Sequence, residues 1–530
     1  MCALEKEIKR EDFHLPPEGL SEERRKDALA KFDEYLGEQK SHFLGYQANQ
    51  ELHYEEMAKY LNCQINNLGD PYKNGNFTLN SKIVERAVLD YYARLWNIAP
   101  YNPDDPRSCW GYVLSMGSSE ANLYGLWNGR DYLAGKFLLE PTEEETRKAS
   151  LRQEGATRVE SGAIARRVTE FSEPNSLSPV LFYSEDTHYS IIKSAIVLRL
   201  KTFYEIGTEK YPEDCPLPDA KEWPRAVPSE GGAEGTGAID IDKLAILVEF
   251  FASKGYPILI NFNYGTTFKG AYDNVEAAGR KLMPIFKRHG LVSRKVYYNT
   301  KDKKQYDIRS GFWFHVDGAL GAAYMPFIER AYYEGLIDRR GPKFDFDLPF
   351  VHSIAMSGHK WIGAPWPCGI YMTRRKYQLL PPDNPEYIGA LDSTFAGSRN
   401  GLSALLLWNY LARTSYDKQV KKALHTQRIA DYAHKRLKHL EKKLNKDLWV
   451  ARSPLSLTVR FKQARPEIIF KYSLSGETFY VDGRKRAFNH IFAMSHATEE
   501  TIDSLIEDLS QPGAFPKQNA ENNSNAVTET

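Results

Sequence analysis

The amino-acid sequence predicts an α/β fold with a central, mainly parallel sheet and helices on both faces. Beyond Cys109, short apolar runs alternate with helical patterns, and each run ends in a loop of small and polar residues. Strands that alternate with helices in this way indicate βαβ units and a parallel sheet. The chain has 530 residues, of which 42% are hydrophobic and 26% charged, which is enough for a large α/β unit and a smaller domain.

The first hundred residues are expected to be largely helical. Ser21 is a typical N-cap, and the acidic residues that follow it suit the first turn of a helix. From Leu79 to Trp96 the apolar residues recur at steps of three and four. This spacing predicts an amphipathic helix that packs one face on a core.

The strands of the sheet are expected in the segments that follow. Residues 110–135 predict a strand, a glycine turn and a helix, and residues 179–198 repeat this order. Further strands are predicted within PILINFNYG, GFWFHVDGALGA and HSIAMSGHKW. Open α/β sheets bind ligands at the carboxyl ends of their strands, so the polar residues at these ends are expected to form one site.

The remaining segments define the domain organisation. Residues 141–176 are charged and residues 208–238 are rich in Pro, Gly and acidic residues, which predicts two surface insertions. Helical patterns resume after Gly401. The expected organisation is an N-terminal helical segment (1–100), a large domain (101–400), a small C-terminal α/β domain (401–515) and a disordered tail (516–530).

Charge and cysteine content narrow the expected partners and location. The 70 Lys and Arg residues balance the 69 Asp and Glu residues, so no overall field attracts nucleic acid or anionic lipid. The five cysteines are scattered and include no CxxC pair, which fits a reducing compartment and argues against a zinc knuckle. Neither a signal peptide nor a spanning helix is apparent. We therefore expect a cytoplasmic protein that binds neither nucleic acid nor membranes.

The most informative motif is SGHKW, in which Lys360 directly follows a predicted buried strand. Burial disfavours an ammonium group and lowers the pKa of a lysine, which makes the amine a usable nucleophile. Such lysines form Schiff bases with carbonyl compounds, pyridoxal phosphate among them. Taken alone, the motif is better explained by a lysine that extends past Trp361 to the solvent.

Asp317 ends another predicted strand, in the motif HVDGA. An aspartate at this position is typical of a loop cap. It also fits a carboxylate that faces the pyridine nitrogen of pyridoxal phosphate and keeps it protonated, so that the ring accepts electrons. In the second interpretation Gly318 and Ala319 leave room for the flat ring.

Three more motifs fit the same cofactor, although each has an ordinary structural explanation. Ser118 and Ser119 begin a predicted helix, whose N-terminus suits either a phosphate or a simple N-cap. His188 follows a strand and suits stacking on a flat ring, or a structural role. The segment NYGTTFKGAYD adds Thr266, Thr267 and Asp273, which are also typical of a turn.

In combination, SGHKW, HVDGA and GSSEAN resemble the group II pyridoxal-phosphate-dependent amino-acid decarboxylases, over roughly residues 40–410. FLGYQAN, INNLGDPY and YIGALDSTFAGSRNG are most similar to the bacterial-type histidine decarboxylases and to the decarboxylases of valine or methionine. The resemblance implies the aspartate-aminotransferase-like (type I) fold. It also implies a homodimer with a shared active site, in which the N-terminal segment wraps the partner subunit and residues 101–400 bind the cofactor.

The resemblance further implies roles for individual residues. Lys360 forms the Schiff base, Asp317 pairs with the pyridinium nitrogen, and His188 stacks on the ring. The remaining implied cofactor contacts are Ser118, Ser119, Ser353 and His359 around the phosphate, Thr267 near the ring hydroxyl and His188, Ala319 beneath the ring, and Ser398 from the partner subunit.

The family's mobile loop usually carries a tyrosine that protonates the substrate α-carbon, and Tyr387 is assigned that role here. Relatives that lack this tyrosine produce aldehydes, so an aldehyde synthase is an alternative. An aminotransferase would need an arginine for the substrate carboxylate. Arg399 lies near a motif but is better explained as part of GSRNG.

The segment INNLGDPYKNGN is expected to line the substrate pocket. Leu68, Pro71 and Tyr72 suit an apolar side chain, whereas Asn66, Asn67 and Asp70 suit an imidazole. Near the predicted site the sequence shows no cluster of cations of the kind that a glutamate decarboxylase would need to bind a side-chain carboxylate. We therefore expect decarboxylation of an aliphatic L-amino acid, such as methionine, leucine or valine, to the primary amine and CO₂. Histidine, aromatic substrates and a non-catalytic scaffold of the same fold are the alternatives.

Overall fold

The computed structural model of the chain describes residues 8–139, 168–169, 174–218, 220–297, 306–381, 385–481 and 484–516. Contacts divide the chain into two compact units. One combines Met1–Gln50 with His425–Thr530, and the other is Glu51–Leu424. Residues 51–100 and 401–424, which the sequence places in flanking domains, belong to the larger unit.

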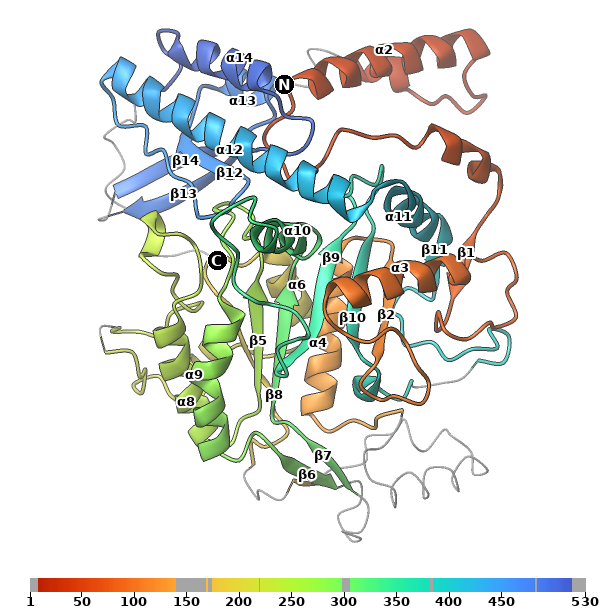
Figure 1. Ribbon diagram of the computed structural model, residues 1–530, viewed down its shortest axis with the longest axis vertical. Helices are drawn as coiled ribbons and strands as arrows, with labels where there is room; N and C mark the ends of the chain where they lie inside the picture. Colours follow the sequence, from red (N-terminus) through yellow and green to blue (C-terminus); the bar gives the residue numbers. More distant parts are fainter. Residues whose placement is uncertain are drawn as a thin grey trace. The chain divides into compact units, whose positions relative to one another are not determined.

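A six-stranded sheet forms the centre of the larger unit (Figure 1). Its strands are, in spatial order, β2 (Cys109–Leu114), β10 (Gly369–Arg374), β9 (Val351–Ser357), β8 (Phe312–Asp317), β5 (Ile258–Asn263) and β4 (Val180–Phe182). Strands β4, β5, β8 and β9 are parallel, and β10 is antiparallel to both of its neighbours, so β2 points the same way as β9. The predicted α/β fold with a mainly parallel sheet is confirmed.

Helices cover this sheet, as its composition requires. Every residue of β2, β5, β8 and β9 is buried, which is typical of strands covered on both faces. Helix α4 (Ser118–Leu133) packs against β8, β9 and β10, α10 (Gly321–Tyr333) against β9, and α8 (Ile241–Ser253) against β5. Helix α6 (Tyr189–Leu198) packs on α4, and α9 (Val275–Arg288) packs on α8 (Figure 1).

A two-stranded ladder joins distant parts of the larger unit. Strand β1 (Asn66–Leu68) pairs antiparallel with β11 (Ser398–Asn400). Helix α3 (Lys82–Leu95), which the apolar spacing predicts, packs on α11 (Gly401–Arg413). These contacts are the reason that residues on either side of the predicted domain boundaries group with the central sheet.

The predicted insertion over residues 208–238 is anchored in the core rather than lying free on the surface. Trp223 is buried against Phe250, and its indole N–H donates to the Tyr211 carbonyl oxygen at 2.7 Å. Val227 is also buried and forms a parallel bridge with Ser184, which precedes His188. The insertion predicted at 141–176 lies largely outside the described residues, as does nearly all of the predicted tail.

The smaller unit is an antiparallel sheet with helices. Its strands are β12 (Thr458–Lys462), β14 (Arg484–Phe492) and β13 (Ser475–Val481), in that spatial order. Its core includes Leu437, Leu440, Phe461, Tyr472 and Leu505. Helix α2 (Glu22–Ser41) begins where the sequence predicts, because the Ser21 side chain accepts the Arg24 N–H.

The other elements complete the chain. They are α7 (Phe203–Lys210), α12 (Tyr416–Leu444), α13 (Pro466–Lys471), α14 (Glu499–Ser510), the sheet of β3 (Val168–Thr169), β6 (Arg294–Tyr297) and β7 (Tyr306–Arg309), and the 3-10 helices η1 (Arg10–Phe13), η2 (Glu55–Asn62), η4 (Gly232–Glu234) and η5 (Arg375–Tyr377). In the described part of the chain, no helix is both long and apolar enough to cross a membrane.

Candidate active site

One pocket lies at the carboxyl ends of the parallel strands. Its lining residues are Ser118, His188, Asn263, Gly265, Thr266, Thr267, Asp317, Ala319 and Lys360. They follow or end β2, β4, β5, β8 and β9, which is where open α/β sheets bind ligands. The structure therefore brings together Ser118, His188, Thr267, Asp317, Ala319 and Lys360 as the sequence predicts.

Lys360 supplies the amine of the pocket. Removal of this amine from water lowers its pKa, and the nearby Asp317 carboxylate acts in the opposite direction. A lowered pKa increases the fraction of neutral, nucleophilic amine near neutral pH. Trp361, by contrast, is wholly buried, so Lys360 does not reach the solvent along an exposed tryptophan.

Asp317 is a buried acceptor at the end of β8. Its Oδ1 accepts the Ala319 N–H at 3.1 Å, and its Oδ2 accepts a proton of the Asn122 amide at 2.9 Å. The first contact is the loop cap that the sequence allows. Since Asp317 also lines the pocket, the cap and the predicted interaction with a ring nitrogen are compatible.

His188 lines the same pocket from the N-cap of α6. Its Nδ1 accepts the Ser190 N–H at 3.3 Å and lies 2.8 Å from Ser190 Oγ. Burial is the main cause of its lowered pKa, with a smaller contribution from the Lys360 charge that the Asp317 charge opposes. The imidazole is thus held neutral, and its Nδ1 is turned toward the helix.

Ser118 begins α4 beside the last residue of β9. The Ser118 N–H donates to Ser357 Oγ at 3.0 Å, and the Ser357 hydroxyl donates to Ser118 Oγ at 2.9 Å. Gly117, just before the helix, has φ of +71°, and a Cβ there would lie 2.6 Å from His359 Cε1. The turn at Gly117 thus leads into the N-terminus of α4, beside the hydroxyls of Ser118 and Ser357. A helix N-terminus with hydroxyls is a typical site for a phosphate.

Ser357, which the sequence analysis does not name, is hydrogen-bonded to the pocket residue Ser118, whereas the predicted Ser353 does not contact the pocket lining in this way. Ser353 is four positions earlier on β9, where its Oγ contacts Trp313 Nε1 at 3.1 Å and His315 Nδ1 at 2.8 Å. It is buried below the pocket and does not line it. The pocket lies at the carboxyl end of β9. Ser357 is the last residue of this strand and contacts the pocket residue Ser118, whereas Ser353 lies four positions earlier.

The other predicted phosphate residues lie beside the pocket. Ser119 is exposed, on the first turn of α4. Burial, and then the Lys360 charge, lower the pKa of His359 to about 4. The neutral His359 ring has Nδ1 3.3 Å from the Cys368 carbonyl oxygen, to which it must donate. Neither residue lines the pocket itself.

Both threonines of the loop after β5 line the pocket, and Thr266 also holds the loop together. Thr266 is buried, and its Oγ1 accepts the Ala271 N–H at 2.9 Å. Thr267 is exposed and faces the pocket, as predicted. Asp273 is buried as a structural acceptor for the N–H groups of Ile239 and Asn263, at 2.7 and 2.6 Å. It is part of the turn rather than of the pocket.

The predicted substrate segment does not line the pocket of its own chain. Asp70 is buried, and its carboxylate accepts the Trp110 indole N–H at 3.0 Å and the Gln378 amide at 3.1 Å. Trp110 lies near the start of β2, at the edge of the sheet opposite to the pocket. Leu68, Pro71 and Tyr72 are likewise absent from the pocket lining, and Tyr72 stacks on Tyr101 at 3.7 Å.

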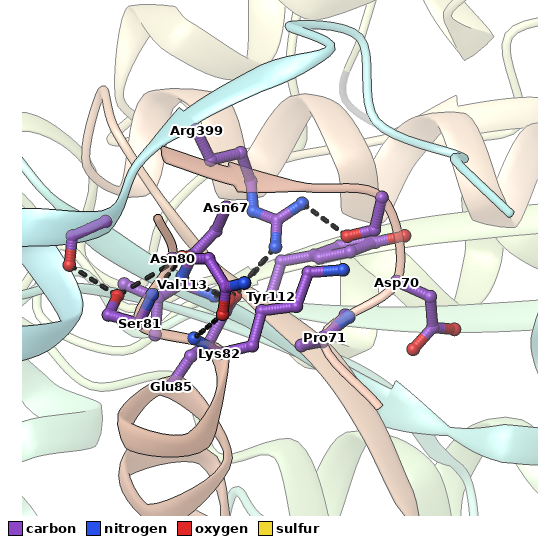
Figure 2. Close-up of polar contacts among 12 residues, drawn as sticks. Asn67, Asp70, Pro71, Asn80, Ser81, Lys82, Glu85, Tyr112, Val113 and Arg399 are labelled. Carbon is purple, nitrogen blue, oxygen red and sulfur yellow. Dashed lines mark hydrogen bonds and ion pairs between the residues drawn. The ribbon is translucent and has the colours of Figure 1, made fainter. Parts of the chain in front are cut away.

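Arg399 is held by a buried carboxylate, as Figure 2 shows. Its Nη2 lies 3.1 and 3.0 Å from the two carboxylate oxygens of Glu85, and Nη1 donates to the Gly69 carbonyl oxygen at 2.9 Å. Glu85 also accepts from Asn67 Nδ2 at 2.7 Å and from the Val113 N–H at 2.9 Å. The guanidinium of Arg399 is therefore held by this network. This supports a structural role for Arg399 within GSRNG rather than binding of a substrate carboxylate.

Two predicted residues lie on the surface of the chain. Tyr387 is 79% exposed, and residues 382–384 before it are outside the described part. Ser398 is exposed as well, and its Oγ accepts the Asn66 amide at 3.1 Å. Neither side chain lines the pocket of its own chain.

The donors of this pocket fit pyridoxal phosphate. A lysine of lowered pKa suits its aldehyde, a carboxylate suits its pyridinium nitrogen, and a helix N-terminus with hydroxyls suits its phosphate. The bound cofactor supplies an electron sink for a carbanion at the substrate α-carbon. The fold and the pocket thus define an enzyme that depends on pyridoxal phosphate.

Comparisons with known proteins identify the family. The pyridoxal-dependent decarboxylase conserved domain matches residues 169–442. The chain is similar to the solved structure of L-methionine decarboxylase from Streptomyces sp. 590, with 46% identity and a TM-score of 0.87 over 95% of this chain and 97% of that one. It is 28% identical to histidine decarboxylase of Solanum lycopersicum, over 91% of this chain and 88% of that protein. It is 26% identical to serine decarboxylase 1 of Oryza sativa subsp. japonica, over 96% and 80%.

The chain belongs to the pyridoxal-dependent decarboxylase family. It is a carbon–carbon lyase that uses pyridoxal phosphate to remove the carboxyl group of an amino acid. The prediction of this family, cofactor and reaction from the sequence is confirmed.

Proposed function

We propose that the enzyme decarboxylates an aliphatic L-amino acid, with L-methionine as the preferred substrate, to the primary amine and CO₂. The similarity that carries this proposal is the 46% identity to L-methionine decarboxylase over almost the whole of both chains. The curated histidine and serine decarboxylases are 25–28% identical and support the reaction more than the substrate. Histidine is therefore the second candidate.

The roles of the pocket residues follow from their positions. We assign the cofactor aldehyde to Lys360, the ring nitrogen to Asp317 and the ring face to His188. The phosphate is assigned to the helix start at Ser118, together with Ser357. Because Asp317 accepts hydrogen bonds on both carboxylate oxygens, its orientation is set before the cofactor binds.

The site is proposed to be completed by a second copy of the chain. Tyr387 and Ser398 are exposed and do not line the pocket of their own chain, nor does the segment around Asp70. A dimer allows the surface residues of one subunit to reach the pocket of the other. Helix α6, which begins beside His188, also carries an exposed apolar face formed by Tyr189, Ile192, Ile196 and Val197. Such a patch is typical of a subunit interface.

Within this dimer, Tyr387 is proposed to protonate the substrate α-carbon, and Ser398 to contact the partner's phosphate site. The location is proposed to be the cytoplasm, which agrees with the scattered cysteines.

A substrate screen tests the proposal. The enzyme loaded with pyridoxal phosphate is incubated with each of the twenty L-amino acids, and mass spectrometry measures amine, aldehyde and CO₂ together. The expected main product is 3-(methylthio)propylamine from methionine, with weaker turnover of leucine or valine. Histamine as the main product would replace the substrate assignment with histidine. Aldehyde with ammonia would make the chain an aldehyde synthase, and no product from any amino acid would overturn the proposal.

A further inference from the structure

A buried asparagine joins the two residues assigned to the cofactor ring. Asn122 lies on the first turns of α4 and has no exposed surface. Its Nδ2 donates to Asp317 Oδ2 at 2.9 Å and to Ser190 Oγ at 3.2 Å. Its Oδ1 lies 3.0 Å from His315 Nε2. The mechanism proposed above uses Asp317 and His188 but leaves this bridge between them unexplained.

The Asp317 carboxylate determines which way the Asn122 amide is oriented, and the amide in turn determines the proton positions on its neighbours. A carboxylate only accepts, so the amide nitrogen of Asn122 must face it, and the amide oxygen must face His315. His315 therefore donates from Nε2. Burial lowers the pKa of His315 to about 4, so the ring is neutral and its Nδ1 accepts the hydroxyl proton of Ser353 at 2.8 Å. Ser353 has a structural role here, below the pocket.

The same reasoning extends to His188. Ser190 Oγ accepts the second amide proton of Asn122 and lies 2.8 Å from His188 Nδ1, to which its hydroxyl proton can be donated. The Ser190 N–H donates to the same nitrogen. With Nδ1 accepting, the proton of the neutral His188 ring must lie on Nε2, the nitrogen that Ser190 does not contact.

We propose that Asn122 is a positioning residue that fixes the proton of His188 on Nε2, through Ser190, while it holds Asp317 as an acceptor for the cofactor nitrogen. The inference rests on the proposed use of this pocket for pyridoxal phosphate. It gives the pocket a donor on His188 at neutral pH without a positive charge. Leucine at this position would remove all three contacts, and aspartate would place a second carboxylate against Asp317.

An aspartate at position 122 makes the proposal testable by pH. When protonated, its carboxyl group donates one hydrogen bond to Asp317 and accepts one from His315, so it partly replaces the amide. When ionised, it repels Asp317. The titratable groups that contact this position are Asp317 and His315 from β8, and the charges that act on the linked His188 are those of Asp317, Lys360 and Lys193.

The first test measures the affinity of the full-length protein for pyridoxal phosphate. We expect Asn122→Leu to weaken it by at least about tenfold, as expected for the loss of a hydrogen bond to a charged group. Asn128→Leu is the matched control, because Asn128 is a buried amide of the same helix that donates to the Tyr377 carbonyl oxygen, away from the pocket. For Asn122→Asp, affinity relative to the wild type should rise as the pH falls, and for Asn122→Leu this ratio should stay level.

The second test observes the tautomer directly. The holoenzyme is labelled with ¹⁵N-histidine, and the His188 signals are assigned by their loss in His188→Gln. We expect an Nε2–H signal in the wild type and in Asn128→Leu, and loss of that single tautomer in Ser190→Ala. A proton on Nδ1 of the wild type would overturn the proposal. So would equal losses of affinity in Asn122→Leu and Asn128→Leu, or a level pH ratio in Asn122→Asp. A failed substrate screen with the expected tautomer and affinities would overturn the proposed substrate alone.

Discussion

At the scale of single residues, the pocket works by placing ionisable groups where burial changes their chemistry. Burial lowers the pKa of Lys360 and of His188 and so favours the uncharged form of each, while Asp317 is kept as an acceptor by two N–H donors. These effects need only the contacts within the pocket.

Replacing Lys360 tests the assignment of the cofactor aldehyde. Lys360→Ala removes the amine that lines the pocket, so the purified variant mixed with pyridoxal phosphate should lack the visible absorption of a protonated Schiff base, and activity should be lost. The measurement is the absorption spectrum after removal of free cofactor. Lys422→Ala is a control, because Lys422 is another buried lysine, which donates to the Trp361 carbonyl oxygen outside the pocket. A visible band that persists in Lys360→Ala would move the aldehyde to another amine.

Replacing Tyr387 tests the assignment of the acid. Tyr387→Phe removes one hydroxyl from an exposed side chain, so folding should be unchanged. We expect the product to shift from amine toward aldehyde and ammonia, with uptake of O₂, because the α-carbon is protonated more slowly. Amine, aldehyde and O₂ are measured in the same reaction, with Tyr480→Phe as an exposed control in the smaller unit. An unchanged product ratio would assign the proton to another group.

At the scale of elements, strands and helices are tied to the pocket by buried polar contacts. The Glu85–Arg399 pair joins α3 to β11, and the same carboxylate holds β2 through the Val113 N–H (Figure 2). Strand β2 leads directly into the turn at Ser118. We therefore expect the geometry of the proposed phosphate site to depend on a charge pair that does not line the pocket.

A double-mutant cycle tests this pair. Glu85→Gln leaves the Arg399 cation buried without its carboxylate, which should cost about 3–5 kcal/mol of the free energy of unfolding. Glu85→Gln combined with Arg399→Met removes both charges and should recover a large part of that loss. Chemical denaturation of the wild type, both single variants and the double variant measures the coupling. Additive losses in the double variant would show that the two charges do not stabilise each other.

At the scale of the whole molecule, we expect the exposed apolar surface to govern assembly and the buried histidines to govern stability in acid. The apolar face of α6 lies next to the pocket, so an interface there would link assembly to activity. The buried His315 and His352 lie within the larger unit, and burial lowers the pKa of both.

The oligomeric state tests the proposed dimer. The native mass should be twice the 60.6 kDa of the chain, measured by light scattering after size exclusion. Ile196→Lys places a charge on the apolar face of α6 and should shift the mass toward a single chain, with loss of activity. Leu336→Lys, which alters another exposed apolar residue after α10, should leave the dimer intact. A single-chain mass for the wild type with full activity would contradict the shared site.

Acid should destabilise the fold over a defined pH range. The folded-state pKa of His315 is about 4 and its ordinary value is 6.5, so between these values the unfolded chain binds more protons. Stability from this residue is complete above pH 6.5 and is lost as the pH falls toward 4, by on the order of 3 kcal/mol. Urea denaturation between pH 7 and 4.5 measures the slope, which should be smaller in His315→Gln. An identical slope in that variant would refute this origin.

The sequence by itself determined the fold class, the family and the centre of the site. Lys360, Asp317 and His188 each follow a strand with a strong local pattern, and parallel strands bring their carboxyl ends to one edge whatever the details of packing. The start of α2 after Ser21 and the amphipathic pattern of α3 also depend only on residues that are close together in the sequence.

Only the tertiary structure decided which polar residues support that centre. Asn122 is the last residue of GSSEAN. The sequence does not predict its role, because its partners Asp317, Ser190 and His315 are distant in the sequence. Ser353 and Ser357 lie on the same strand, and the register of β9 alone decides which of them meets Ser118. Asp70 is predicted to line the substrate pocket, but in its own chain its carboxylate accepts hydrogen bonds from Trp110 and Gln378. A hydrogen bond between distant segments leaves no periodicity in the sequence, so only the folded chain reveals it.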